Sequence, residues 1–161
     1  MTDADPQDGR DETAAERNDR NWTEILQELR VIQTGTQILT GFLLTLAFQQ
    51  RFTDLDTYQV DTYLVLVAVA TLATILALTP VAIHRTVFRM QAKESLVLIS
   101  NRLLKTTLIV VGLTLTGTTM LVFDVVVGRG AGIVAGVITL ALALVSWLAL
   151  PVRVRWKNRR D

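Results

Sequence analysis

Four long apolar stretches alternate with shorter polar segments along the chain. They cover residues 31–49, 63–83, 106–127 and 131–150. Each is close to the roughly 20 residues that an α-helix needs to cross the hydrocarbon of a bilayer. Backbone amides must be paired within hydrocarbon, so such a stretch crosses as a helix. The pattern predicts an all-α integral membrane protein, a four-helix transmembrane bundle whose domain covers residues 21–151.

The first stretch is not apolar on all sides. Its polar and small residues fall on one side of a helix and its large apolar residues on the other. This polar stripe consists of Arg30, Gln33, Thr34, Gln37, Gly41 and Thr45. Hydrocarbon offers no partner to an amide, so we expect the stripe to face the bundle interior. Gln33 and Gln37 are expected to hydrogen-bond across helices, with binding of an ion or a substrate amide as the alternative.

The fourth stretch carries a nearly continuous line of small residues. The line comprises Gly128, Gly132, Gly136, Thr139, Ala143 and Ser146. Gly132 and Gly136 form a small-xxx-small motif, which lets two helix backbones approach closely. We expect this surface to pack against a second copy of the chain or against another membrane protein.

Three further segments complete the domain organisation. Residues 1–20 are acidic and nearly without large apolar side chains, so a disordered tail is predicted. Residues 84–105 interleave basic and apolar side chains, which is typical of an amphipathic connection on an anionic membrane surface. Residues 152–161 form a basic tail expected to contact lipid headgroups. Its contact residues would be Arg153, Arg155, Trp156, Lys157, Arg159 and Arg160.

The basic residues alternate between the segments that flank the apolar stretches. Of the sixteen Lys and Arg, fourteen lie in the N-terminal region, the second connection and the C-terminal tail. Only Arg51 and Arg129 lie in the first and third connections. The positive-inside rule then places both termini in the cytoplasm and predicts a multi-pass protein of the cytoplasmic membrane.

Composition excludes several classes of chemistry. The 161 residues include no cysteine and one histidine, which rules out disulfides, thiol catalysis and clusters of thiolate or imidazole metal ligands. No phosphate-binding loop, dinucleotide fingerprint or nucleophile elbow occurs. We therefore expect no enzymatic activity, no catalytic residue, no metal and no cofactor. The basic tail directly follows an apolar stretch, so phospholipid is expected as its partner and nucleic acid is not.

Three ionisable residues remain as candidates for an ion or proton site. Asp61 and Asp124 are expected at the outer ends of their spans, in a rim of exposed ion pairs. The alternative is an outer cation site. His84 is the one histidine of the chain, and we expect it to make a packing or headgroup contact, with proton transfer as the alternative.

Two segments and the spacing between them resemble a known family. ELRVIQTGTQILTGFLLTLAFQQRF and YLVLVAVATLATILALTPVAIHR are similar to an uncharacterised bacterial family of small four-span membrane proteins. Some of its members carry the automatic label sodium:proton antiporter. The resemblance implies fold and location and brings no catalytic residues with it.

The expected function is a structural, accessory or interaction role in the membrane, without catalysis. One alternative is a small dimeric transporter, similar to a cation/proton antiporter or a small multidrug exporter. A third hypothesis is a membrane-surface sensor that works through residues 84–105.

Overall fold

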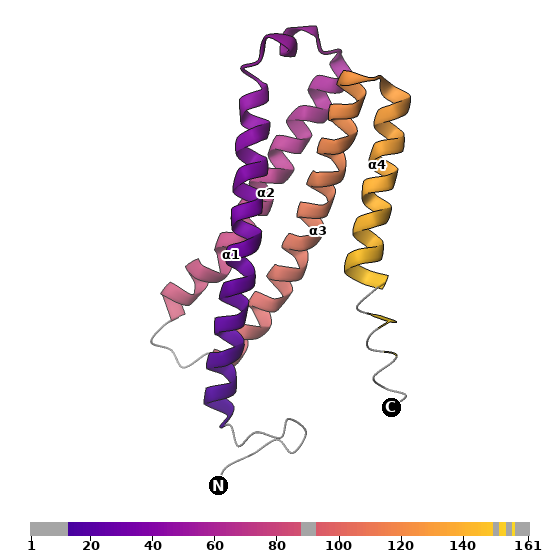
Figure 1. Ribbon diagram of the computed structural model, residues 1–161. Coiled ribbons are helices and arrows are strands. Elements are labelled where there is room, and N and C mark those ends of the chain that lie inside the picture. Colours follow the sequence, from indigo (N-terminus) through magenta and orange to yellow (C-terminus); the bar gives the residue numbers. More distant parts are fainter. Residues whose placement is uncertain (1–12, 88–92, 150–151, 154–155, 157–161) are drawn as a thin grey trace. The chain divides into compact units, whose positions relative to one another are not determined.

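The computed structural model describes residues 13–87, 93–149, 152–153 and 156 (Figure 1). All regular elements of this described part are helical. They are α1 (Ala14–Leu46), η1 (Gln50–Asp54), α2 (Thr57–Val87), α3 (Lys93–Val126), α4 (Arg129–Leu144) and η2 (Val145–Ala149). The last is one turn of π-helix that continues α4.

Three segments of these helices are long and apolar enough to cross a membrane. They are Thr57–Arg85, Leu98–Val126 and Arg129–Ala149. They match the second, third and fourth apolar stretches of the sequence and give the chain the character of a membrane protein. Helix α1 is not among them.

Helix α1 begins earlier than the sequence pattern predicts. Thr13 donates its backbone N–H to Glu16 over 2.9 Å and its hydroxyl over 2.7 Å. Glu16 returns its own N–H to the Thr13 hydroxyl, which completes a capping box. Both hydrogen bonds from Thr13 lower the pKa of Glu16, and the bond from its backbone N–H has the larger effect. The expected disordered tail therefore needs correction, since its residues 14–20 are helical, while residues 1–12 lie outside the described part.

The chain divides into two compact units. The first comprises Met1–Ile38 with Ala73–Leu108, and the second comprises Leu39–Leu72 with Ile109–Asp161. Helices α1, α2 and α3 are each divided between the two units, whereas α4 belongs wholly to the second.

The first unit has a small apolar core. Ile25 and Leu29 of α1 pack with Leu104 of α3. Ala73 and Ala77 of α2 are also fully buried, as expected for residues that allow helices to approach. Pro80 is buried as well, and α2 continues through it to Val87.

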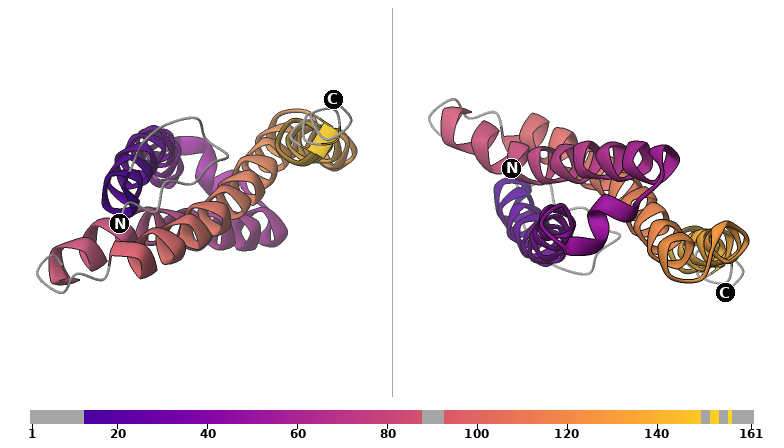
Figure 2. Two further views of the ribbon diagram at one scale, coloured as in Figure 1. Left: turned by 90° about the horizontal axis from the view of Figure 1, so that it is seen from below. Right: turned by 90° about the horizontal axis from the view of Figure 1, so that it is seen from above.

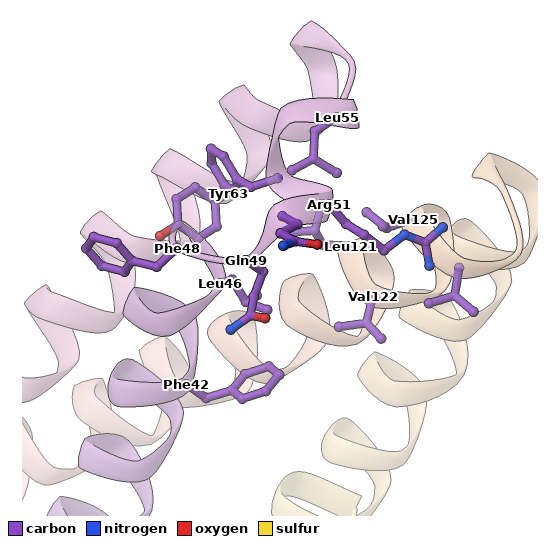
Figure 3. Close-up of a pocket in the computed structure, with 13 residues that line it drawn as sticks. Phe42, Leu46, Phe48, Gln49, Arg51, Leu55, Tyr63, Leu121, Val122 and Val125 are labelled. Carbon is purple, nitrogen blue, oxygen red and sulfur yellow. The ribbon is translucent and has the colours of Figure 1, made fainter.

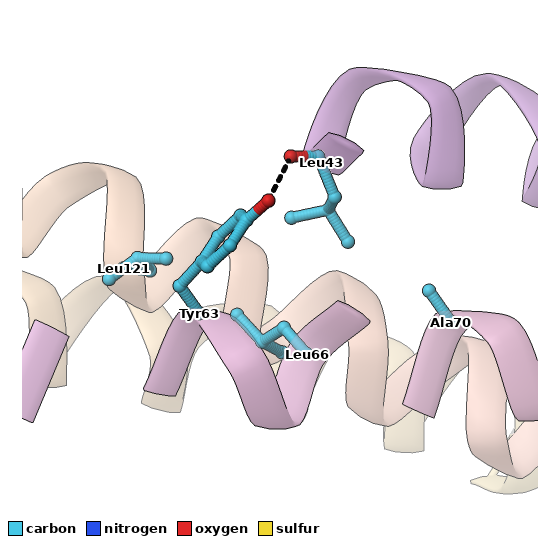
Figure 4. Close-up of a cluster of buried hydrophobic side chains, with 5 residues drawn as sticks. All are labelled: Leu43, Tyr63, Leu66, Ala70 and Leu121. Atoms are coloured by element: carbon cyan, nitrogen blue, oxygen red, sulfur yellow. Dashed lines mark hydrogen bonds between the residues drawn. The ribbon is translucent and has the colours of Figure 1, made fainter. Parts of the chain in front are cut away.

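The second unit has its core near the C-terminal end of α1. There the 3₁₀ turn η1 joins α1 to α2, and residues of this connection line a pocket (Figure 3). Deeper in the unit, five side chains form the buried cluster. They are Leu43, Tyr63, Leu66, Ala70 and Leu121 (Figure 4). The Tyr63 hydroxyl donates to the Leu43 carbonyl over 3.0 Å, so a polar group inside an apolar cluster is paired.

Within the second unit, the C-terminal part of α3 lies beside the start of α4 in both Figure 1 and Figure 2. Gly132 and Gly136 are buried at this contact. A Cβ at Gly132 would lie 2.7 Å from the backbone oxygen of Met120, and one at Gly136 would lie 3.1 Å from the Met120 Cβ. The small-xxx-small motif therefore serves contact within the chain. Of the remaining line, Thr139 and Ala143 are half-buried and Ser146 is exposed.

The polar stripe of α1 lies on the outside of the chain, so the prediction that it faces the interior is wrong. Only Gln33 is half-buried. Arg30, Thr34, Gln37, Gly41 and Thr45 are exposed. The buried side of α1 instead carries Leu29, Thr36 and Leu43. This side combines large apolar side chains with a threonine whose hydroxyl bonds to the Ile32 carbonyl of its own helix.

The expected amphipathic connection over residues 84–105 is not a separate helix. Helix α2 extends to Val87 and α3 begins at Lys93, so most of the segment prolongs two helices. Residues 88–92 lie outside the described part. The exposed basic side chains Arg85, Arg102 and Lys105 therefore project from these helices.

The contact at Gly132 can be tested by adding one methyl group. Gly132→Ala would drive a Cβ into the Met120 backbone, and we expect a loss of about 1–3 kcal/mol in stability from overpacking. Gly130→Ala is the matched control, because a Cβ there meets nothing within 4 Å. The measurement is unfolding of the full chain in detergent micelles. Equal stability of the two variants would contradict the close contact.

Candidate functional site

Charged side chains meet at one end of the second unit, where α1 ends and α2 begins, and where α3 ends and α4 begins. We call it the turn end. Arg129 lies at its centre. Its Nη2 is 2.7 Å from Oδ2 of Asp56, and its Nε is 3.4 Å from Oδ2 of Asp124. Its guanidinium carbon lies 3.9 Å above the centre of the Tyr58 ring, which adds a cation–π contact.

Local sequence signals position each member of this cluster. Asp56 and Gln59 form a capping box at the start of α2, with N–H bonds of 2.8 and 3.1 Å. Gly128 has φ +131°, a conformation that favours glycine, and it separates α3 from α4. The N–H of Gly128 also bonds to the Phe123 carbonyl. This turn brings Arg129 back over Asp124, five residues earlier.

The two ion pairs of Arg129 differ in how far the carboxylate is buried. The side chain of Asp56 is 55% exposed, so its pair with Arg129 contributes little net stability. The side chain of Asp124 is only 7% exposed, so loss of the guanidinium beside it would leave a buried carboxylate without an ion-pair partner. The expectation of an exposed ion pair is therefore wrong for Asp124. Its burial follows from Gly132, where a Cβ would lie 2.9 Å from the Asp124 Cβ.

The other candidate residues that the structure describes lie apart from the Arg129 cluster. Asp61 is exposed on α2 and is not part of the Arg129 cluster. His84 belongs to the first unit, where its ring is half-buried and stacks on Trp22 with centroids 4.7 Å apart. Arg153 and Trp156 of the basic tail are exposed. Arg155, Lys157, Arg159 and Arg160 lie outside the described part.

The Arg129 cluster is a set of ion pairs that holds three helix ends together. One guanidinium links the start of α2, the end of α3 and the start of α4. In the described part of the chain, no group of three His, Cys, Asp or Glu side chains could hold a metal ion. Sequence reasoning missed the role of Tyr58. No local pattern links it to Arg129, since the two residues meet only through the fold.

The fold is thus that of an all-α protein with three candidate membrane spans. The chain belongs to DUF6328, a family of unknown function, whose model matches residues 11–151. Comparison with curated proteins and with solved structures gives no match.

The dependence of Asp124 on its cation can be tested by a mutant cycle. Arg129→Ala should cost about 1–3 kcal/mol, because it leaves a buried carboxylate without its partner. Asp56→Asn should cost less, about 0.2–1 kcal/mol, because that pair is exposed and an asparagine can still cap α2. Adding Asp124→Asn to Arg129→Ala should restore part of the lost stability, as measured by unfolding in detergent. If the stability losses of Arg129→Ala and Asp124→Asn simply add in the double variant, the two side chains are not energetically coupled.

Proposed function

We propose that the chain is a four-span protein of the cytoplasmic membrane, and that it acts without catalysis by associating with a second copy through α1. It would serve as a structural or accessory component. The distribution of Lys and Arg supports a cytoplasmic location of both termini. The exposed polar stripe of α1 is the observation that carries the proposal.

The packing of α1 supports its assignment as a membrane span in addition to the three candidate spans of α2, α3 and α4. In the second unit, Leu43 of α1 is fully buried in the cluster with residues of α2 and α3. In the first unit, Ile25 and Leu29 pack with Leu104 of α3. Both segments of α1 thus contact a helix that is apolar enough to cross a membrane. A helix packed along such spans lies at the same depth as they do.

At that depth the stripe needs partners that lipid does not supply. The threonines satisfy themselves, since Thr34 donates to the Arg30 carbonyl over 2.9 Å and Thr45 to the Gly41 carbonyl over 2.8 Å. Gln33 and Gln37 have no side-chain hydrogen bond to any described residue. An amide carries both donor and acceptor groups, so two copies of the same stripe complement each other.

The interface can be tested at two adjacent positions of the stripe. Gln37→Leu should weaken self-association by about 0.6–2 kcal/mol, the value of an interhelical hydrogen bond in a membrane. Thr34→Val is the matched control, because the Thr34 hydroxyl already bonds to its own helix. The measurement is fluorescence energy transfer between labelled copies in liposomes. A chain that stays monomeric, or a Gln37→Leu variant that associates as strongly as the parent, would refute the interface.

The transporter alternative draws its support from the buried carboxylate of Asp124. Ion-coupled carriers place a titratable group part-way across the bilayer. Asp124 instead lies two residues before the end of α3, and Arg129 already pairs with it. The ionisable residues of the candidate spans lie toward the span ends, which leaves no charge carrier between them.

We therefore expect no Na⁺/H⁺ exchange by the purified protein. The assay uses proteoliposomes that contain a pH-sensitive dye and are challenged with a Na⁺ gradient. The dye signal should match that of empty liposomes. Exchange that disappears in Asp124→Asn or Asp61→Asn would favour the transporter instead.

A further inference from the structure

We propose that the second unit binds one anionic membrane lipid at the turn end, with an acyl chain in the pocket beside η1 and the phosphate on Arg51. This proposal rests on the membrane location of the proposed function and is independent of self-association through α1.

The pocket has the size and lining of a small-molecule site. Its volume is about 600 Å³, within the usual range for ligand pockets. Most of its wall is apolar, and the apolar side chains come from α1, α3, the connection after α1 and the start of α2. Figure 3 shows Phe42 and Leu46 on the side of α1 and Leu121, Val122 and Val125 on the side of α3. Such a wall suits a hydrocarbon chain.

The polar part of the lining lies at one place, in the connection that follows α1. Gln49, Gln50 and Arg51 contribute to the pocket there. The Tyr63 hydroxyl also borders the pocket, but it is engaged by the Leu43 carbonyl. A ligand would thus meet apolar walls and one cluster of hydrogen-bond donors, which is the arrangement that an amphiphile requires.

Arg51 supplies the charge that selects an anion. It is exposed and makes no ion pair with any described carboxylate. Arg129, at the same end of the unit, is instead held by Asp56 and Asp124. Arg51 is therefore the turn-end cation that remains available to a phosphate, and a guanidinium matches phosphate geometry with two parallel N–H bonds.

The depth of the pocket also fits a lipid. Arg51 lies between the end of α1 and the start of α2, beyond the apolar segments, where lipid headgroups are found. The neighbouring apolar side chains Phe48 and Val126 are 87% and 67% exposed. A lipid with its phosphate at Arg51 can run its chain into the pocket past these side chains without leaving the bilayer.

The test compares an anionic and a zwitterionic lipid with the same acyl chains. Full-length protein in detergent is titrated with phosphatidylglycerol and with phosphatidylcholine of the same acyl chains, and bound lipid is counted by native mass spectrometry. We expect phosphatidylglycerol to bind more tightly. Arg51→Gln should weaken its binding about fivefold, the effect of one basic side chain near an anionic membrane surface. It should weaken phosphatidylcholine binding less, because the choline cation offsets the charge of that lipid's phosphate.

Two further variants and a soluble probe complete the design. Arg129→Gln removes a cation that lies at the same end but does not line the pocket. The preference for phosphatidylglycerol over phosphatidylcholine should persist in this variant. Val122→Trp fills the apolar wall and should weaken both lipids, with helical content checked by circular dichroism. Glycerol phosphate, a headgroup without a chain, should bind far more weakly than the lipid. An unchanged preference in Arg51→Gln, full binding in Val122→Trp, or equal binding of glycerol phosphate would each overturn the site.

Discussion

The absence of hydrogen-bonding solvent in hydrocarbon is the constraint on which this structure depends. A polar group at membrane depth needs a partner within protein, and several threonines of the chain find it in their own helix. Thr107 and Thr114 are fully buried on α3, and each hydroxyl bonds to the carbonyl four residues earlier on the same helix. Tyr63 reaches the Leu43 carbonyl of another helix. Buried polar side chains of this kind allow close packing without strong demands on the neighbouring helix.

Charged groups cannot be satisfied in this local way, and the chain gathers them where helices end. The Arg129 cluster links the start of α2, the end of α3 and the start of α4. Its geometry depends on Gly128, which turns the chain, and on Gly132, which makes room for Asp124. The same end carries the pocket and the available guanidinium of Arg51. The turn end therefore combines a structural clamp with the most promising binding surface of the described part.

The two surfaces suited to helix association both lie differently from what the sequence suggested. The glycines of α4, which the sequence suggested for contact with a second chain, are used against Met120 of α3. The glutamines of α1, expected inside, lie on or near the outside. This arrangement is physically consistent. Small residues gain most from the tight contact within a chain, and exposed amides retain the donors and acceptors that a second copy can use.

The sequence by itself determined the helices, the three apolar spans and several of their ends. Helical length and apolarity follow from local composition. The caps at Asp56 and Thr13 follow from short patterns as well, since each has a Gln or Glu three residues later. Only the tertiary structure decided which helix faces are buried, and this determined the surroundings of Gln37, Asp124 and Tyr58. In water, a buried face is marked by its hydrophobicity. In a membrane, the lipid side and the protein side of a helix are both apolar, so the sequence pattern carries little information about which side packs.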